Sequence, residues 1–134
     1  MKIKLANGME IPIVMCYNHG RRFINGETRE CRDIVIKDDA ISLDELKVLL
    51  LNPDNLSVIE LTTKRIVEVV SADETVSYEE VLGTSILENF THACEIKDCL
   101  NGEIVFTLGE KTALELEHEE AMRAIDALLI AMEV

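Results

Sequence analysis

The stretch KIKLANGMEIPIVM, residues 2–15, begins the chain with the pattern of an antiparallel β-hairpin. Apolar residues alternate with polar ones on both sides of Asn7-Gly8, a dipeptide typical of tight turns between strands. A two-residue turn would place Leu5 opposite Glu10 and mix apolar with acidic side chains. A three-residue loop with Gly8 in the left-handed conformation places Leu5 opposite Met9 instead, which gathers the apolar side chains on one face. We therefore predict the three-residue loop.

Further β-rich segments follow this hairpin. The segment CYNHGRRFINGETREC, residues 16–31, is interpreted as a connection between two strands, with turns at Gly20 and at Asn25-Gly26. The triplet Thr-Lys-Arg at residues 63–65 is interpreted as a tight hairpin turn, and residues 72–83 fit either a short helix or a strand. The other expected strands cover residues 32–37, 56–62, 66–70, 90–96 and 104–108.

A short helix is predicted from about residue 42 to residue 51. Ser42 is the expected N-cap, and Glu45 lies three residues later, as in a capping box. Asn52-Pro53 should end the helix, because proline disfavours the helical conformation of the residue before it. Leucine and valine occupy almost every remaining position, so we expect this helix to pack on more than one side.

The longest predicted helix covers about residues 111–132. Met122, Ile125, Leu129 and Met132 are three, four and three residues apart and therefore form an apolar seam. Glutamates crowd the first half of the helix, where negative charge suits the positive end of the helix dipole. We expect the seam to pack against the chain's own sheet, with self-association as the alternative.

These elements together predict an α+β fold in one domain, residues 1–134. Antiparallel β-hairpins form its sheet, with one short packed helix (about 42–51) and a long C-terminal helix (about 111–132). The C-terminal helix is the candidate oligomerisation element. A chain of 134 residues is long enough to bury a core without disulfides or metal ions.

Charge and composition narrow the classes of function. The formal net charge of −13 opposes binding to phosphate backbones and to anionic lipid headgroups, so we expect neither a nucleic-acid nor a membrane partner. The first residues lack the apolar core of a signal peptide, and the longest apolar run is the six residues 127–132. We expect the protein in the cytoplasm of its producer, with its four cysteines as thiols.

Two residue pairs are candidates for chemistry. Cys16-x-x-His19 and His92-x-Cys94 offer four ligands of the kinds that zinc prefers, or a thiol and its base. The paired Cys-x-x-Cys and His-x-x-x-His spacings of common zinc sites are missing, however, and alternation along residues 90–96 places His92 and Cys94 in phase with apolar core positions. We therefore predict no metal ion, no cofactor and no catalytic site. The alternative is a small metal-dependent or thiol enzyme that uses these four residues.

Four arginines lie close together in an otherwise acidic chain: Arg21, Arg22, Arg29 and Arg32. The simplest interpretation is that they pair with the protein's own carboxylates, which at a surface contributes little to stability. The functional interpretation is that they form, with Phe23, a docking patch for an acidic protein surface, including that of a neighbouring copy.

Several short motifs occur in a recognisable order. They are KLANG at residues 4–8, GRRFINGETRE at 20–30, SLDEL at 42–46, NPDN at 52–55 and ENFT at 88–91. This order resembles a group of short proteins encoded in prophages of low-GC Gram-positive bacteria, which often carry an Arg-Tyr-Phe-Gln-Gly-x-x-Arg-Asp pattern where this chain has residues 22–30. The departures are Phe23, Ile24, Asn25 and Glu30, each similar in character to the residue that it replaces.

The resemblance implies a gene of the tail or baseplate region and a virion-associated or assembly role, without catalytic residues. We therefore expect a non-enzymatic phage-derived protein that acts through protein–protein contacts, with a second copy of itself or other phage structural proteins as partners. It would then be found in the bacterial cytoplasm or in the virion. Another alternative, which only the charge supports, is an acidic regulatory binder of a host protein.

Overall fold

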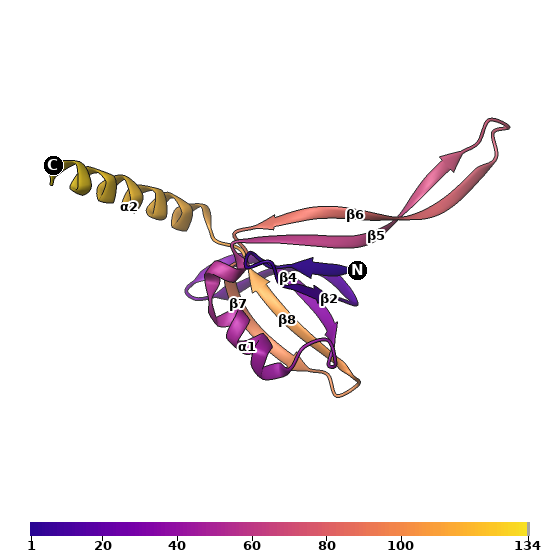
Figure 1. Ribbon diagram of the computed structural model, residues 1–134, viewed down its shortest axis with the longest axis horizontal. Coiled ribbons are helices and arrows are strands. Elements are labelled where there is room, and N and C mark those ends of the chain that lie inside the picture. Colours follow the sequence, from indigo (N-terminus) through magenta and orange to yellow (C-terminus); the bar gives the residue numbers. More distant parts are fainter. Residues whose placement is uncertain (134) are drawn as a thin grey trace.

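The computed structural model describes residues 1–133 and has an α+β fold (Figure 1). Its strands form two antiparallel four-stranded sheets, accompanied by one short helix and a long C-terminal helix, and the predicted fold class is confirmed. One sheet has the order β2-β1-β5-β6 and the other β3-β4-β8-β7. The elements are β1 (Lys2–Lys4), β2 (Glu10–Pro12), β3 (Met15–Ile24), β4 (Glu27–Lys37), α1 (Leu43–Leu51), a 3₁₀ turn (Pro53–Leu56), β5 (Val58–Val70), β6 (Val76–Glu88), β7 (His92–Asp98), β8 (Glu103–Gly109) and α2 (Ala113–Met132).

Both sheets and α1 contribute to one hydrophobic core. Alternate residues of β1, β2 and the first part of β5 meet alternate residues of β4 and β8, as expected for strands with one buried face. This core, with the elements that enclose it, is called the body below. Its most completely buried apolar side chains are Ile3, Ile11, Cys31, Ile34, Ile36, Leu46, Leu56, Ile59, Phe106 and Leu108.

The N-terminal hairpin has the predicted register. Ile3 lies opposite Ile11, and the amide of Leu5 donates to the carbonyl of Met9 at 2.9 Å. Gly8 has a φ of 88°, a conformation that glycine adopts without strain. The three-residue loop is therefore confirmed, because only that loop gathers the apolar side chains on the core side.

Helix α1 is also confirmed. The side chain of Ser42 accepts a hydrogen bond from the amide of Glu45 at 3.2 Å, and the helix ends before Asn52 and Pro53. Leu46 and Leu50 are buried, but Val48 and Leu51 on the other side are exposed. The helix thus packs on one side, contrary to the expectation that it packs on several.

The structure corrects the interpretation of residues 16–31. Strands β3 and β4 form a long hairpin here rather than an irregular connection. The turn is at Asn25-Gly26, as predicted, and both residues have positive φ. Gly20, in contrast, lies within β3 at a β-bulge, where the register shifts after Asn18, so it does not end a strand.

A second correction concerns residues 58–88, which form one long hairpin. Strand β5 continues straight through residues 63–65 and pairs with β6 over thirteen residue pairs. The turn lies instead at Ser71–Thr75, where the side chain of Asp73 accepts hydrogen bonds from the Ser71 hydroxyl and from the amide of Thr75. These hydrogen bonds lower the pKa of Asp73 to about 2. The strand alternative for residues 72–83 is therefore the correct one from Val76 onward.

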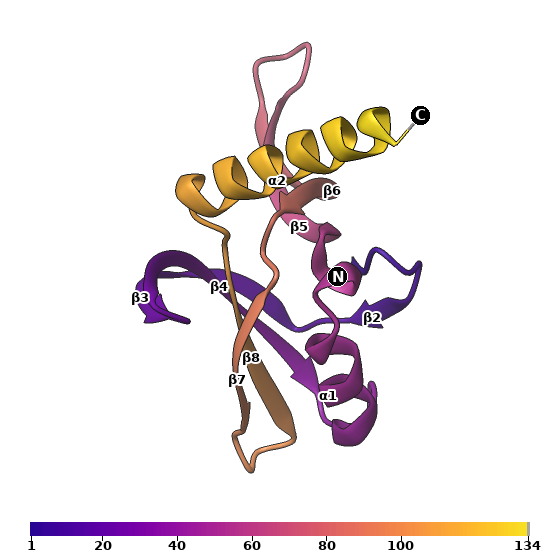
Figure 2. The same ribbon diagram turned by 90° about the vertical axis from the view of Figure 1, so that its left-hand side faces the viewer.

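A third correction concerns α2, which extends away from the body and has no buried residue. The expectation that its seam packs against the chain's own sheet is therefore wrong. In Figure 1, α2 and the β5–β6 hairpin leave the body in opposite directions along its longest axis. Figure 2, seen from the α2 end, shows α2 crossing in front of the β5–β6 hairpin and above the rest of the body, so the helix axis is inclined to the longest axis of the molecule.

Neither described helix is long and apolar enough to cross a membrane; this applies to residues 1–133.

Candidate interaction surfaces

The first candidate surface is an apolar stripe along α2. Six large side chains between 45% and 79% exposed fall within about a third of the helix circumference at about 100° per residue. All four predicted seam residues belong to this set. We call this set the helix stripe: Leu114, Met122, Ile125, Leu128, Leu129 and Met132.

The second candidate surface lies on the outer part of the β5–β6 hairpin. Strand β1 pairs with β5 only as far as Thr62, so the hairpin beyond this residue has no further strand beside it on the β5 side. Residues directly opposite in an antiparallel pair point to the same side, and five large side chains share one side here. They are between 48% and 76% exposed. We call this set the hairpin face: Ile66, Val70, Val76, Tyr78 and Leu82.

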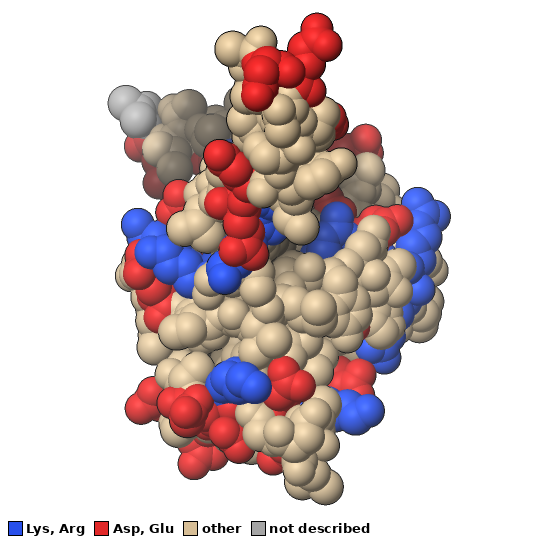
Figure 3. All heavy atoms as spheres, turned by 90° about the vertical axis from the view of Figure 1, so that its right-hand side faces the viewer, with Lys and Arg blue, Asp and Glu red and all other residues tan. Residues whose placement is uncertain are grey.

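Figure 3 shows the molecule from the hairpin end. Acidic side chains stand at the tip of the hairpin, where the turn contains Asp73 and Glu74. Acidic side chains also continue down the hairpin, and residues other than Lys, Arg, Asp and Glu cover most of the surface below it, with lysine and arginine side chains among them. The hairpin face contributes five large exposed apolar side chains on one side of the hairpin. Contiguous apolar surface of this kind is typical of protein interaction sites.

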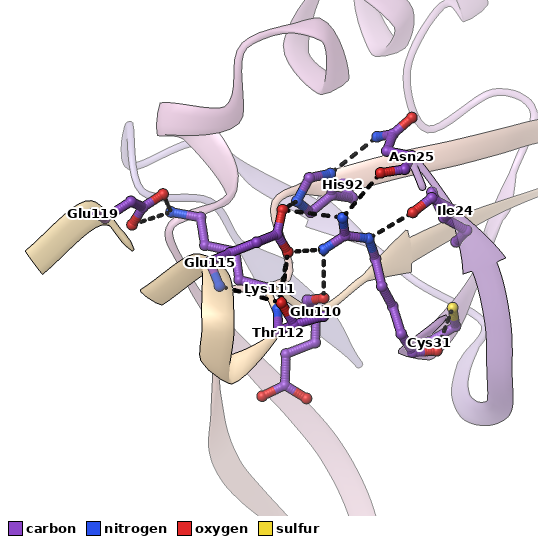
Figure 4. A network of polar contacts seen from close by, with 10 residues as sticks. Ile24, Asn25, Cys31, His92, Glu110, Lys111, Thr112, Glu115 and Glu119 are labelled. Atoms are coloured by element: carbon purple, nitrogen blue, oxygen red, sulfur yellow. Dashed lines mark hydrogen bonds and ion pairs between the residues drawn. The ribbon is translucent and has the colours of Figure 1, made fainter. Parts of the chain in front are cut away.

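The root of α2 is held by the buried side chain of Arg29, whose partners Ile24, Asn25, Glu110 and Glu115 are labelled in Figure 4. Its guanidinium donates to the carbonyl oxygens of Ile24 at 2.8 Å, Asn25 at 3.4 Å and Glu110 at 3.2 Å. It also binds both carboxylate oxygens of Glu115 in the first turn of α2, one of them at 3.0 Å. All of its donor groups therefore tie the β3–β4 turn to the start of α2.

Glu115 joins this network to the cap of α2. Its carboxylate accepts from the amide of Thr112 at 3.0 Å, and its own amide donates to the Thr112 hydroxyl at 3.2 Å, which completes a capping box. Hydrogen bonding from Arg29 lowers the pKa of Glu115 to about 2. The first turn of α2 is thereby fixed to the body, although the rest of the helix contacts little of it.

His92 of β7 completes the network. Its Nδ1 is 3.0 Å from the Asn25 side-chain nitrogen, and its Nε2 is 3.5 Å from Glu115. A neutral ring with its hydrogen on Nε2 satisfies both contacts. Burial lowers the pKa of His92, and the neighbouring Arg29 charge lowers it further. Both effects favour this neutral form.

The structure separates the four arginines by role. Arg29 is only 2% exposed, so it is an internal anchor and not part of a docking patch. Arg21 pairs with Glu30 at 2.9 Å and Arg22 with Glu95 at 3.1 Å, both near the surface. Arg32 lies over the ring of Phe90, 5.2 Å from its centroid.

Phe23 is the apolar residue assigned to that patch, and its side chain is 75% exposed. It lies in β3, an edge strand of its sheet, opposite Thr28 of β4. Phe23 thus remains a candidate contact residue beside Arg21 and Arg22.

The four proposed metal ligands do not form one site. Within residues 1–133, no group of three or more histidine, cysteine, aspartate or glutamate side chains is arranged to hold a metal ion. His19 contacts Asp33, which also accepts from Thr107 at 2.6 Å, whereas His92 belongs to the root of α2. These two histidines therefore have separate structural partners.

The cysteines lie in unlike surroundings. Cys94 is the extra residue of a β-bulge in β7 and is exposed, so the predicted alternation through residues 90–96 is broken and Cys94 is not a core residue. Cys16 is half-buried, and burial raises the pKa of its thiol. A raised pKa makes the thiolate, the nucleophilic form, less abundant at neutral pH.

A groove of about 640 Å³ lies between α1 and β7. Its walls are largely apolar side chains with one lysine, one histidine and one glutamate among them. No group of metal-binding side chains is found there within the described chain. The groove is lined by Asn25, Lys47, Leu50, Leu51, Pro53, Thr91, His92, Ala93, Cys94, Glu95 and Ile96.

Sequence reasoning found the helix stripe but missed the hairpin face. A turn predicted at residues 63–65 divides β5 into two strands. Only the continuous strand places Ile66 and Val70 on the same side as Leu82. The available signal was the absence of Gly, Pro, Asn or Asp at residues 63–65, since these residues usually mark a turn.

Comparison of the chain with protein-family models, with curated proteins and with solved structures finds no significant match.

Proposed function

We propose that this chain is a non-enzymatic structural or assembly protein that acts through protein–protein contacts, and that it belongs to a phage tail or baseplate. The observation that supports this most directly is the exposure of the helix stripe and the hairpin face. Both extend beyond the body and carry large apolar side chains that the described chain leaves in water. Exposed apolar surface of this extent promotes aggregation of a monomer, whereas in a protein that assembles it forms the contacts with the partner.

The way in which both projections are joined to the body supports the same function. The hairpin is paired along its whole length, and α2 is held at its first turn by Arg29 and Glu115. A partner then binds surfaces that are already oriented, so less conformational entropy is lost on association. The place in a phage rests on the resemblance of the motifs at residues 4–8, 20–30, 42–46, 52–55 and 88–91.

Self-association is tested by sedimentation velocity and light scattering on the purified protein from about 1 to about 100 μM, a range in which modest interfaces assemble. We expect the mean mass to rise above the 15.0 kDa of one chain as concentration increases. A mass that stays at one chain up to the highest concentration would overturn self-association.

The phage assignment is tested separately by the genes on either side of this one. Flanking tail and lysis genes are the expected result. Metabolic neighbours would overturn the assignment to a phage, whatever the oligomeric state of the protein.

A further inference from the structure

We propose that copies of this chain join head to tail, with the helix stripe of one copy lying on the hairpin face of the next. This inference rests on the proposed function, because it requires self-association, and it specifies which surfaces meet. The occupant of each surface is therefore a second copy of the same chain.

The directions of the two projections favour this arrangement. Helix α2 and the β5–β6 hairpin leave the body at opposite ends of its longest axis (Figures 1 and 2). A second copy placed beyond the end of α2 can therefore present its hairpin to that helix while its own α2 points onward. Contacts between two different surfaces of identical subunits produce closed rings or open filaments.

The lengths of the two surfaces also match. The twenty residues of α2 extend over roughly 30 Å at about 1.5 Å per residue. The part of β5 beyond Thr62 contains the eight residues 63–70 and extends over roughly 26 Å at about 3.3 Å per residue. One helix can thus cover the outer hairpin along nearly its full length.

A single head-to-tail interface covers both exposed surfaces. Pairing of two α2 helices would cover the helix stripe and leave the hairpin face in water. It would also bring together two helices that each carry five acidic side chains and one arginine: Glu115, Glu117, Glu119, Glu120, Asp126 and Arg123. On the hairpin, Lys64 lies on the same side as Ile66 and Leu82 of the hairpin face.

Repulsion between like charges weakens the contact between the helix stripe and the hairpin face. The hairpin carries Glu68 and Glu80 on the same side as Lys64, so both surfaces are acidic overall. Burial of apolar side chains must therefore drive association against some repulsion between like charges. A contact between one helix and one hairpin belongs to the small class of specific interfaces, on the order of 1,200 Å² in total.

Mixing two variants tests the pairing. The helix variant is Ile125→Glu with Leu129→Glu, and the hairpin variant is Tyr78→Glu with Leu82→Glu; all four side chains are exposed, so the body should fold normally. Sedimentation is measured at about 100 μM protein in about 0.3 M NaCl, where a Debye length below about 8 Å limits repulsion. The matched controls are Ile130→Glu, on the other side of α2, and Val81→Glu, on the opposite face of the hairpin.

We expect each variant alone to stay monomeric, because each has lost one of the two surfaces that every contact requires. Mixed in equal amounts, they should form a dimer of twice the 15.0 kDa monomer mass and nothing larger, because only one intact pair of surfaces remains. The two control variants should assemble like the parent.

Three other outcomes would overturn the head-to-tail pairing. If the hairpin variant alone assembles like the parent, α2 binds a second α2 or the groove between α1 and β7. If the helix variant alone assembles like the parent, the hairpin pairs with itself or with the body. If both variants remain monomeric when mixed, their surfaces do not bind each other. A monomeric parent, in contrast, would overturn the self-association in the proposed function as well.

Discussion

The body and the two projections contain the same kinds of apolar side chain, but the body buries them and the projections expose them. In β8, Ile104, Phe106 and Leu108 are buried, whereas in α2 Leu128 and Leu129 are exposed. The chain therefore divides its apolar residues between a core that stabilises the fold and surfaces that the fold leaves in water. Hydrophobic content alone does not distinguish these purposes; the distinction depends on whether another part of the same chain covers the residue.

The largest expected effect on the free energy of unfolding comes from truncating an aromatic side chain in the core, compared with the same truncation at the surface. Phe106→Ala removes a buried ring and should reduce the free energy of unfolding by about 3–5 kcal/mol. Tyr78→Ala removes an exposed ring and should change it by less than about 0.5 kcal/mol. Urea unfolding at a protein concentration at which both are monomeric measures the difference. Equal losses would contradict the division between body and projections.

Arg29 lies where the two regions meet, and its removal should have the next largest effect. Arg29→Met removes the guanidinium that donates to Glu115 and to three carbonyl oxygens, which should cost about 3 kcal/mol. Arg21→Met breaks an exposed ion pair with Glu30 and should cost less than about 0.5 kcal/mol. Both losses are measured by urea unfolding.

A second measurement on the Arg29 variant tests its role as an anchor of α2. Hydrogen exchange should become faster at the amides of Glu115 and Leu116, which donate to Thr112, while the amides of β4 and β8 that lie far from Arg29 keep their relative protection. If Arg29→Met and Arg21→Met behave alike, the buried network does not hold the helix.

The sequence predicted elements wherever the determining contacts are local. The loop at Gly8 and the cap at Ser42 depend on neighbours within a few residues, and both were predicted correctly. The periodicity of α2 identified its apolar side, but periodicity cannot tell what covers that side. The expectation that it packs on the sheet was therefore wrong.

Other features depend on contacts between distant parts of the chain. Arg29 looked like its neighbours in the sequence because its partners Glu110 and Glu115 are more than eighty residues away. Nothing local distinguishes the one arginine that becomes buried. The β5–β6 hairpin was divided for a different reason: three polar residues at its middle resembled a turn, although the residues that form the real turn lie at Ser71–Thr75.

The smallest expected effect is a pH dependence at the root of α2. The folded state lowers the pKa of His92, so stability is greatest above the usual pKa of histidine and decreases as the pH falls below it. Protonation places a hydrogen on Nδ1, which then no longer accepts from Asn25, and adds a positive charge near Arg29 and Lys111. The carboxylates of Glu115 and Glu119 face the ring and offset part of this repulsion.

Glu115 contributes in a lower and separate range. Its pKa of about 2 lies below the usual value for glutamate, so its contribution is complete at neutral pH and is lost only as the pH falls from about 4.5 toward about 2. Between pH 7.5 and 5.5 the Arg29–Glu115 pair therefore stays ionised, and of these two groups only His92 titrates. Urea midpoints in this range should decrease with acid for the parent and decrease less for His92→Asn. His118→Asn, at an exposed site on α2, is the matched control and should keep the slope of the parent. If His92→Asn keeps that slope too, His92 does not couple the root of the helix to pH.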